Sequence, residues 1–456
     1  MPRYDFVVIG GGLGGYPAAI ELARRGHSVA LVEARRLGGE CANYGCIPTK
    51  ALARAARILA EGSSTPGLSC RLESFAKLMA WVDEIRGRIS EGIETLLEGY
   101  GVKIYWGRGR LRPPGDEVEV SSRGEIVVLE AERAVLVATG SEPSFPKGLE
   151  PDGTRVLDSR GLLELRDLPE SVAVIGGGAV GVELASILAS LGSRVTLIEA
   201  APRLLPGVDA DVASYLAKAL SKRGINVRLS SSTIGLERSK DSVEVILEGG
   251  ERARADVAVV ATGRAPSSRG IGLEECGVEL DERGFVKVSS TMRTSNPKIY
   301  AVGDVVGHPM LAHKAYAQSI VAARNMCGET VEFSKSVPFV VFSIPEVASV
   351  GASEGRSIIF RFGSLGRAIV ESGGEGFLKL VYDPLTLRLT GAHAIGPGAG
   401  EIIYAASLAI DSGLDLNSLA DSVAPHPTMV EALREAGQLA LGRPIHFLLR
   451  GRRRGI

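Results

Sequence analysis

Residues 5–33 of the chain read DFVVIGGGLGGYPAAIELARRGHSVALVE, and residues 171–199 repeat this stretch in outline as SVAVIGGGAVGVELASILASLGSRVTLIE. Each copy predicts a strand, a tight glycine turn, an amphipathic helix and a second strand that ends in a glutamate. That glutamate follows the last glycine of the turn by 18 residues in both copies (33 − 15 and 199 − 181). The repeat therefore predicts two βαβ units and an α/β fold.

The glycine content shows why the repeat matters more than either motif alone. Glycine accounts for 57 of 456 residues, so about one G-x-G-x-x-G pattern is expected by accident. Chance does not explain two patterns at a constant offset of 166 residues (171 − 5). The aligned positions are Gly10, Gly12, Gly15 and Glu33 in the first unit, and Gly176, Gly178, Gly181 and Glu199 in the second.

The spacing of each unit suits the binding of a dinucleotide. The first glycine permits the turn, the second lets the backbone approach a pyrophosphate, and the helix N-terminus offers free N–H groups. The closing glutamate can bond both ribose hydroxyls. A second repeat, AERAVLVATG at 131–140 and RADVAVVATG at 254–263, predicts a strand that closes each unit. We therefore expect two bound dinucleotides; the alternative is a pair of glycine turns in an α/β fold without nucleotides.

Composition excludes several classes of protein. The 45% hydrophobic and 23% charged residues are typical of a folded globular chain, not of a disordered or collagen-like one. A net charge of −1 gives no long-range attraction to nucleic acid or to an anionic membrane, and we expect neither as a partner. We find neither an apolar run of about 18 to 20 residues nor a signal-peptide pattern, so we expect a cytoplasmic protein.

Two further regions complete the predicted organisation. Residues 51–100 alternate apolar and charged residues at helical spacing, with a Gly/Ser/Pro cluster near 62–70, which predicts two helices joined by a loop. From residue 337 onward, VPFVVF, GFLKLVYD and LTGAHAIG predict strands, and helices are expected around 401–410 and 428–440. This last region is predicted to be a separate α+β domain.

Cys41 and Cys46 are the only two of the five cysteines that lie close together, within GGECANYGCIPTK at 38–50. A disulfide needs Cα atoms about 4.4 to 6.8 Å apart, which the intervening glycine and a helix start make feasible. A zinc site would need two more ligands nearby, and a pair of free thiols is the other alternative. A redox disulfide beside a dinucleotide is favoured. Lys50, four residues after Cys46, would share its helical face and stabilise a thiolate.

A candidate base lies near the C-terminus. Only a thiolate attacks a disulfide, so thiol exchange needs a proton acceptor. His426 lies between two prolines in APHPT, and Glu431 follows it five residues later. An imidazole with a carboxylate partner is suited to proton transfer near neutral pH.

These motifs and their order resemble those of the flavoprotein disulfide reductases, the class I pyridine nucleotide-disulfide oxidoreductases, and within them the dihydrolipoamide dehydrogenases. Further matching signatures are ATGS at 138–141, ATGRAP at 261–266, VGDVVGHPMLAHKA at 302–315, PEVASVG at 345–351 and HPTMVE at 426–431. The resemblance implies two Rossmann-like domains, for FAD and NAD, and a C-terminal α+β dimerisation domain. The implied boundaries are 1–141 with 264–334 for the FAD-binding domain, 142–263 for the NAD-binding domain and 335–456 for the dimerisation domain.

The resemblance also assigns roles to individual residues. Cys41 would exchange with the substrate, Cys46 would be the thiolate next to the flavin, and Lys50 would form an ion pair with Glu183 there. The residues implied to hold FAD are Gly10, Gly12, Gly15, Glu33, Lys50, Gly109, Thr139, Gly140, Ser141, Asp304, Met310, Leu311, Ala312 and His313. Those implied to hold the nicotinamide cofactor are Gly176, Gly178, Gly181, Glu199 and Gly263. No metal site is expected.

The implied activity is oxidation of protein-bound dihydrolipoamide by NAD⁺, with electrons passing from the substrate to the Cys41–Cys46 disulfide, then to FAD and NAD⁺. His426 and Glu431 of one subunit would complete the disulfide site of the other, so an obligate homodimer is implied. The protein partner would be a lipoyl-carrying domain of a 2-oxoacid dehydrogenase or glycine cleavage system. Glu199 would repel the 2′-phosphate of NADP, which favours NAD.

Three points stay open at this stage. One alternative function is an NAD(P)H-dependent reductase of another low-molecular-weight disulfide, and a second is a non-catalytic flavoprotein electron carrier. The intact cysteine pair and the His426 motif argue against the second. The arginine-rich tail at 450–454 is expected to be a solvated end, with docking to an acidic carrier domain as the alternative.

Overall fold

The first repeated stretch forms β1 (Arg3–Ile9), α1 (Tyr16–Arg24) and β2 (Val29–Glu33) in the computed structural model, which describes residues 1–448. β1 pairs in parallel with β2 on one side and with β6 (Glu125–Val137) on the other. Alternate residues of β1 enter two different hydrophobic clusters, one on each face of the sheet. Burial on both faces explains the continuous apolar run FVVI.

The sheet around β1 has seven strands. Its other members are β3 (Lys103–Trp106), β4 (Arg108–Arg112), β5 (Glu117–Ser122) and β17 (Ile299–Ala301). The strand order is β3-β2-β1-β6-β5-β4, with β17 also paired to β6. The strand order reverses at β1, and ligands of open α/β sheets bind at such a point, beyond the carboxyl ends of the strands.

Two long helices follow the first unit, as predicted for residues 51–100. They are α3 (Cys46–Ser64) and α4 (Phe75–Gly99), and the predicted Gly/Ser/Pro break separates them. α3 begins at Cys46 itself, five residues before the predicted region. The remaining helical segments of this part are α2 (Gly39–Asn43), η1 (Glu274–Cys276), η2 (Gly303–Val306) and α8 (Ala312–Met326).

The second repeated stretch folds in the same way, into β9 (Ser171–Ile175), α6 (Ala179–Leu191) and β10 (Arg194–Ile198). β9 pairs in parallel with β10 and with β15 (Val257–Val260), the strand predicted within 254–263. The remaining elements of this unit are β8 (Val156–Leu157), α5 (Ser159–Leu162), α7 (Ala210–Lys222), β11 (Asn226–Arg228), β12 (Thr233–Arg238), β13 (Val243–Leu247) and β14 (Arg252–Ala255). The parallel sheet has the order β11-β10-β9-β15-β8, and β12, β13 and β14 form a separate antiparallel sheet.

Two short strands connect the units. β7 (Ser141–Pro143) and β16 (Arg264–Pro266) pair antiparallel and carry the chain into and out of the second unit. The boundaries predicted at 141/142 and 263/264 coincide with these strands, although the extent of each domain remains a prediction.

The C-terminal region is an α+β unit, as predicted. Its antiparallel sheet has the order β18-β19-β22-β21-β20 and consists of β18 (Phe339–Val341), β19 (Val347–Gly351), β20 (Arg356–Arg361), β21 (Phe377–Tyr382) and β22 (Leu389–Ile395). Its helices are η3 (Phe362–Ser364), α9 (Gly366–Ser372), α10 (Ala399–Asp411), α11 (Leu416–Ala420) and α12 (Glu431–Ala440). β19 and β20 were not predicted, because they are short and the charged ends of β20 conceal its apolar centre.

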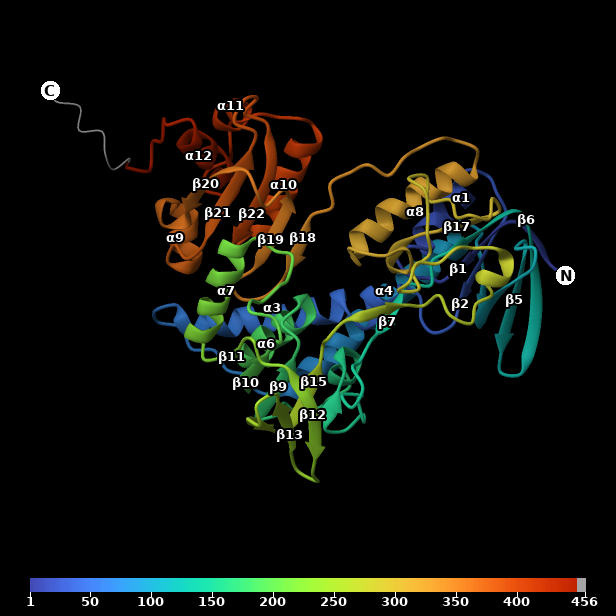
Figure 1. Cartoon of the computed structure of the whole chain (residues 1–456), viewed down its shortest axis with the longest axis horizontal. Helices are drawn as coiled ribbons and strands as arrows, with labels where there is room; N and C mark the ends of the chain where they lie inside the picture. Colours follow the sequence, from blue (N-terminus) through green and yellow to red (C-terminus); the bar gives the residue numbers. More distant parts are fainter. Residues whose placement is uncertain (449–456) are drawn as a thin grey trace.

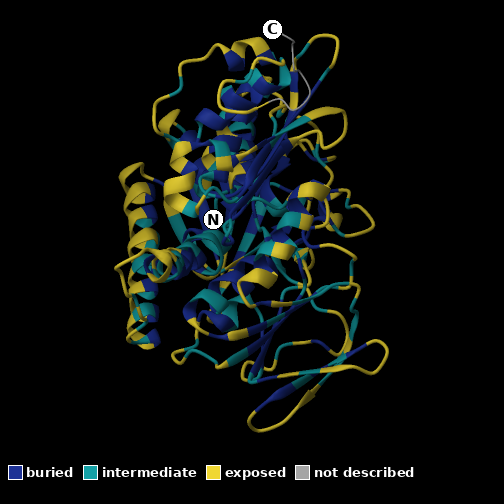
Figure 2. Ribbon diagram, turned by 90° about the vertical axis from the view of Figure 1, so that its left-hand side faces the viewer, coloured by how far each residue is buried: buried dark blue, intermediate teal, exposed yellow. Residues whose placement is uncertain are grey.

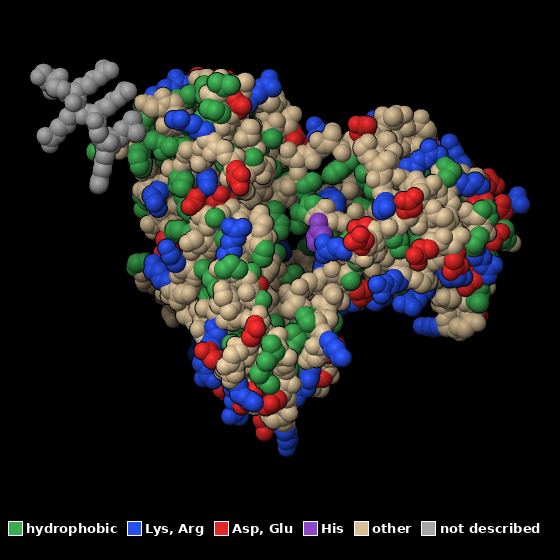
Figure 3. Space-filling view, viewed as in Figure 1, with side chains coloured by type: hydrophobic (Ala, Val, Ile, Leu, Met, Phe, Trp, Pro, Cys, Tyr) green, Lys and Arg blue, Asp and Glu red, His purple; other side chains and the backbone are tan. Residues whose placement is uncertain are grey.

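The C-terminal unit packs on the second βαβ unit (Figure 1), and Ile344 also shares a hydrophobic cluster with Leu52 of α3. Val341, Phe377 and Ile395 of its sheet share one hydrophobic cluster with Val182 of α6 and Leu216 of α7. Figure 2 shows that buried residues are concentrated in the sheets, with exposed residues on the outer faces of the helices. The space-filling view is hollowed between the C-terminal unit and the part that contains β1 (Figure 3). The arginine-rich tail at 450–454 lies outside the described residues.

Candidate active site

The first and third glycines of each turn are required by backbone packing. At Gly10, where φ is 106°, a Cβ would lie 2.3 Å from the carbonyl oxygen of Ala138. A Cβ at Gly15 would lie only 1.7 Å from the carbonyl oxygen of Gly10. The equivalent distances in the second unit are 2.4 Å at Gly176 and 1.8 Å at Gly181. The two turns therefore have the same close approach of helix and strand.

The second glycine of each turn faces open space instead. A Cβ at Gly12 would meet no atom closer than the Cα of Gly39 at 3.7 Å, and a Cβ at Gly178 would meet nothing within 4 Å. Gly263, which follows β15 with φ of 150°, is equally open. A pyrophosphate that approaches the helix N-terminus would occupy the space beside the second glycine. The turns therefore fit two dinucleotides.

The acid that closes each unit is held in place by backbone amides. Glu33 Oε2 accepts a hydrogen bond from the amide of Gly11 and Oε1 from that of Arg35, both at 2.7 Å. Glu199 accepts the equivalent pair at 2.5 and 2.7 Å. Because a carboxylate has about four acceptor positions, each glutamate can still bond ribose hydroxyls.

A hydrogen-bonded chain lies beyond the carboxyl end of β6. The hydroxyl of Ser141 donates to Asp304 Oδ2 at 2.6 Å and accepts from Nε of Arg264 at 2.7 Å. Nearby, the hydroxyl of Thr139 is buried and has no hydrogen-bond partner among residues 1–448. Gly140, with φ of 74°, has no atom within 4 Å of its Cβ position. An unpartnered hydroxyl and an open glycine at this edge fit a bound FAD.

Gly109 has a structural explanation that the sequence did not suggest. A Cβ there would lie 2.9 Å from a side-chain carbon of Ile9 and 3.3 Å from one of Val32. The missing side chain therefore lets β4 pack across β1 and β2. A direct contact between Gly109 and FAD remains a prediction.

The segment predicted to close over the flavin leads into α8. Met310 and Leu311 are half-buried just before the helix, which begins at Ala312. His313 is exposed, and its Nε2 lies 2.6 Å from the carbonyl oxygen of Pro338. The imidazole therefore contacts the chain that leads to β18, and a contact between His313 and FAD remains a prediction.

The two cysteines of the predicted pair lie on consecutive helices. Cys41 is in α2, and Cys46 is the first residue of α3. Both are free thiols in this structure. The hydrogen bond from Cys41 holds the pKa of Cys46 below its usual value, and the ammonium of Lys50 lowers it further. The same contact, together with burial, raises the pKa of Cys41. Cys46 is therefore the thiol that ionises first, as expected at a helix N-terminus.

Lys50 and Glu183 meet at the junction of the two βαβ units. Nζ of Lys50 donates to Oε1 of Glu183 at 2.7 Å, and the hydroxyl of Thr49 lies 3.0 Å from the same oxygen. Nζ also lies 4.5 Å from the ring centroid of Phe342. The structure thus brings together the predicted pair next to Cys46.

His426 and Glu431 form a dyad at the start of α12. Nδ1 of His426 lies 3.1 Å from Oε2 of Glu431, whose Oε1 accepts from the amide of Thr428 at 2.8 Å. Although burial opposes ionisation, this amide and the imidazole hold the pKa of Glu431 below its usual value. His426 is 76% exposed. Among residues 1–448, no contact joins His426 to either Cys41 or Cys46 of the same chain.

Sequence analysis missed an ionic cluster next to the cysteines. Arg160 of α5 donates to Glu40 at 2.5 Å and to Glu142 at 2.8 Å. Arg264 of β16 lies 3.2 Å from the same Glu40. The cluster ties α2, which contains Cys41, to both strands that connect the units. Local patterns could not reveal it, because the partners of Glu40 lie 120 and 224 residues away.

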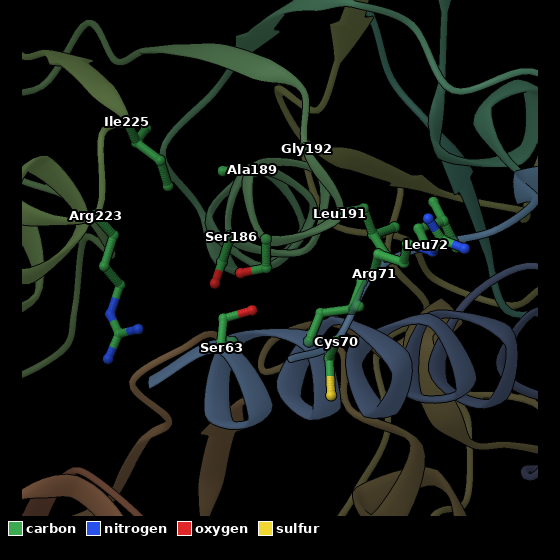
Figure 4. Close-up of a pocket in the computed structure, with 13 residues that line it drawn as sticks. Ser63, Cys70, Arg71, Leu72, Ser186, Ala189, Leu191, Gly192, Arg223 and Ile225 are labelled. Carbon is green, nitrogen blue, oxygen red and sulfur yellow. The ribbon is translucent and has the colours of Figure 1, made fainter. Parts of the chain in front are cut away.

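A separate cavity of about 440 Å³ lies between the C-terminal halves of α3 and α6. Figure 4 shows Ser63 of α3 and Ser186 of α6 facing one another across it. None of the predicted site residues lines it. The redox centre therefore occupies the other end of the same two helices.

Among residues 1–448, no group of three or more His, Cys, Asp or Glu residues could hold a metal ion. No helix in the same range is long and apolar enough to cross a membrane.

Paired dinucleotide turns with a thiol pair between them define a class of redox protein. Residues 4–319 match the family described as pyridine nucleotide-disulphide oxidoreductase, and residues 337–437 match its dimerisation domain. The chain belongs to this family.

The chain can also be compared with individual proteins that resemble it. The chain is 42% identical to a protein named dihydrolipoyl dehydrogenase from Thermus scotoductus, over 99% of this chain and 100% of the relative. It is 36% identical to a dihydrolipoyl dehydrogenase of Geobacillus stearothermophilus, over 97% of each chain. Among solved structures, LpdA of Mycobacterium tuberculosis superposes with a TM-score of 0.90 at 28% identity, over 96% of this chain and 99% of that one. The HOCl-induced flavoprotein disulfide reductase RclA of Escherichia coli gives 0.85 at 28%, over 96% and 100%.

Proposed function

We propose that the chain is a FAD-dependent enzyme that oxidises protein-bound dihydrolipoamide with NAD⁺. The observation that carries the proposal is the Cys41–Cys46 pair at the start of α3, with Lys50 and Glu183 beside it and a dinucleotide turn in each unit. Full-length relatives named dihydrolipoyl dehydrogenase support this substrate over another disulfide.

Thiol exchange begins with Cys41 and Cys46 joined as a disulfide. A thiolate of dihydrolipoamide attacks Sγ of Cys41 and releases Cys46 as a thiolate. The second substrate thiol loses its proton to a base and displaces Cys41, so the product is the cyclic disulfide of lipoamide and two electrons remain on the protein thiols. Because a thiol with a lowered pKa leaves faster, the environment of Cys46 suits it to be the leaving group.

The nucleotide-binding residues fit FAD in the first unit and NAD in the second. FAD, when bound, supplies a two-electron carrier between the thiols and NAD⁺. The first turn, Glu33 and the open edge at Thr139 and Gly140 would hold it. Lys50 would place a fixed positive charge where negative charge develops. Glu199, anchored by two amides, would repel a 2′-phosphate and so favours NAD over NADP.

The base for thiol exchange is supplied by a second subunit in this proposal. The C-terminal unit matches the dimerisation domain of the family. His426 is exposed and touches neither cysteine of its own chain within the described residues. We infer a homodimer in which His426 of the partner subunit takes the substrate proton while Glu431 holds its imidazole.

The partner and the compartment follow from the same proposal. A lipoyl-carrying domain would present the dithiol to Cys41, and a reducing cytoplasm would suit a chain whose cysteines carry a redox role rather than a structural framework. Both statements remain proposals.

The test is dihydrolipoamide-dependent reduction of NAD⁺ by the purified protein. We expect a yellow protein that forms NADH from NAD⁺ and dihydrolipoamide and works much less well with NADP⁺, while Cys41→Ser abolishes turnover. Fast reduction of another small disulfide, without lipoamide turnover, would support the alternative reductase instead.

Mixed dimers test the shared site. Cys41→Ser and His426→Gln subunits are each expected to be inactive as homodimers. When they are unfolded together and refolded at equal ratio, half of the dimers contain one intact site, so about a quarter of wild-type activity should return. No recovery in a dimeric preparation would contradict a site built from two subunits.

A further inference from the structure

The segment from Phe342 to Glu346, between β18 and β19, is anchored to both helices of the redox centre. The amide of Ile344 donates to the hydroxyl of Ser186 on α6 at 2.8 Å, and Ser186 is only 2% exposed. Glu346 accepts from Arg57 of α3 at 3.3 Å and from the amide at the second residue of α10 at 2.6 Å. A fixed segment therefore connects the C-terminal unit to α3 and α6, the two helices that carry Lys50 and Glu183.

Phe342 begins this segment and contacts the ammonium of Lys50. Its ring centroid lies 4.5 Å from Nζ, while Glu183 accepts from Nζ at 2.7 Å. The side chain of Lys50 is 33% exposed, so the ammonium is neither free in solvent nor fully enclosed. Two groups from different units, an aromatic face and a carboxylate, thus determine where this charge lies.

An aromatic face acts on a cation differently from a second carboxylate. Its quadrupole attracts an ammonium that lies within about 6 Å of the centroid. The ring accepts no proton and has no net charge, so it restrains the ammonium without neutralising it. A charge restrained in this way remains available to stabilise negative charge that develops next to it.

We propose that Phe342 is a positioning residue for the redox reaction. Its ring, delivered by the C-terminal unit, holds the Lys50 ammonium against Glu183 and thereby sets the electrostatic potential at the flavin and at Cys46. The proposal rests on FAD binding as proposed above and is independent of the identity of the disulfide substrate. It also gives the C-terminal unit a second role, because that unit controls a charge inside its own subunit.

The test compares Phe342→Leu with Phe342→Tyr, which keeps the ring. Phe339→Leu is the matched control, because Phe339 begins β18, three residues before Phe342, but packs into the cluster of the second unit. We measure the flavin midpoint potential of the FAD-loaded protein and steady-state kinetics. Phe342→Leu should make the potential more negative and lower kcat about three- to tenfold, with KM for NAD⁺ unchanged. Phe342→Tyr and Phe339→Leu should have the same flavin midpoint potential and kcat as the wild type.

Replacement of Phe342 by 3,4,5-trifluorophenylalanine separates the electrostatic role from packing. The fluorinated ring keeps the shape but withdraws charge from the π face, so it should reproduce the changes seen in Phe342→Leu. It also decides the question if Phe342→Leu fails to fold. A wild-type potential in the fluorinated protein would overturn the proposal, as would equal losses in Phe342→Leu and Phe339→Leu. Because the potential is measured without lipoamide, a different disulfide substrate would not alter this outcome.

Discussion

Lys50 follows the first βαβ unit and Glu183 belongs to the second, yet Nζ of Lys50 lies 2.7 Å from Oε1 of Glu183. Each residue lies near the N-terminus of a long helix, Lys50 in α3 and Glu183 in α6. These helices pack together, and α3 begins at Cys46. The ion pair therefore joins the part of the protein that contains the thiols to the part that is expected to bind NAD.

Removal of this charge should slow electron transfer more than binding. We expect Lys50→Met to lower kcat about 10- to 100-fold with little change in KM for NAD⁺, because the ammonium stabilises charge that develops only during the reaction. Steady-state kinetics at saturating dihydrolipoamide check this. Lys77→Met, on the exposed face of α4, serves as the control. A kcat of Lys50→Met within twofold of the wild-type value would rule out an electrostatic role for Lys50.

The acidity of Cys46 should depend on Cys41. In the reduced wild-type protein the hydrogen bond from Cys41 lowers the pKa of Cys46, so Cys46 should be alkylated by iodoacetamide at a lower pH than an ordinary thiol. Cys41→Ala removes this donor and should move the alkylation profile of Cys46 to higher pH, because the thiolate forms only above the raised pKa. Mass spectrometry across a pH series measures the profile. Cys70→Ser should leave it unchanged, and an unshifted profile in Cys41→Ala would show that the contact is unimportant.

The two kinds of glycine in the second turn should respond differently to alanine. Gly178→Ala fits the folded protein but fills the space expected for the pyrophosphate, so KM for NAD⁺ should rise at least about tenfold while the melting temperature and FAD content stay near wild type. Gly181→Ala places a Cβ 1.8 Å from the carbonyl oxygen of Gly176 and should destabilise the fold itself. Thermal melts and NAD⁺ kinetics distinguish the two effects. Unchanged NAD⁺ kinetics in Gly178→Ala would contradict the position of the nucleotide.

A buried ion pair fastens the C-terminal sheet to the second unit. Nζ of Lys379 lies 2.8 Å from Oδ2 of Asp209 and 2.7 Å from Oδ2 of Asp211, and the Asp209 side chain is 3% exposed. Lys379→Met would leave that carboxylate buried without its partner, which should cost about 2 to 4 kcal/mol. Thermal unfolding should show the loss, whereas Lys335→Met, at an exposed pair of 4.0 Å, should change little. Equal melting temperatures for the two variants would contradict this.

The effect of Lys379 should also depend on pH. Burial opposes ionisation of Asp209, but Lys379 holds its pKa below the usual value. Stability from a carboxyl with a lowered folded-state pKa is complete above the unfolded pKa of about 3.9 and is lost as the pH falls through the folded value. The difference in melting temperature between wild type and Lys379→Met should therefore be largest near pH 7 and shrink as the pH falls, because the buried Asp209 of the variant, without its lysine, takes up a proton at a higher pH than that of the wild type. A difference that stays the same or grows from pH 7 to pH 4 would contradict this.

Much of the fold could be predicted because its signals are local. The spacing of Gly10, Gly12 and Gly15 and the apolar runs on either side predict a strand, a turn and a helix within about 30 residues. The antiparallel strands β4, β5, β19 and β20 were not predicted. Their sequences are short and partly charged. They form strands only because neighbouring strands supply hydrogen bonds and bury their apolar side chains.

Some residues of the candidate site could be predicted from the sequence, and others could not. Cys41 and Cys46 attract attention because they are close together in a chain with few cysteines, and His426 because a carboxylate follows it at short range. The role of Glu183 came from a resemblance, since nothing around it distinguishes it from other helical acids. Glu40 and Phe342 were missed, because their partners lie in distant parts of the sequence.

The sequence by itself determined that this protein has two dinucleotide-binding units, a thiol pair beside one of them and a C-terminal α+β unit, since each follows from residues close together in the chain. Only the tertiary structure decided that Lys50 meets both Glu183 and Phe342, and that Glu40 is fixed by two arginines. The physical reason is that electrostatic contacts depend on distances of a few ångströms between side chains. Such distances arise only when helices and strands from separate units pack together.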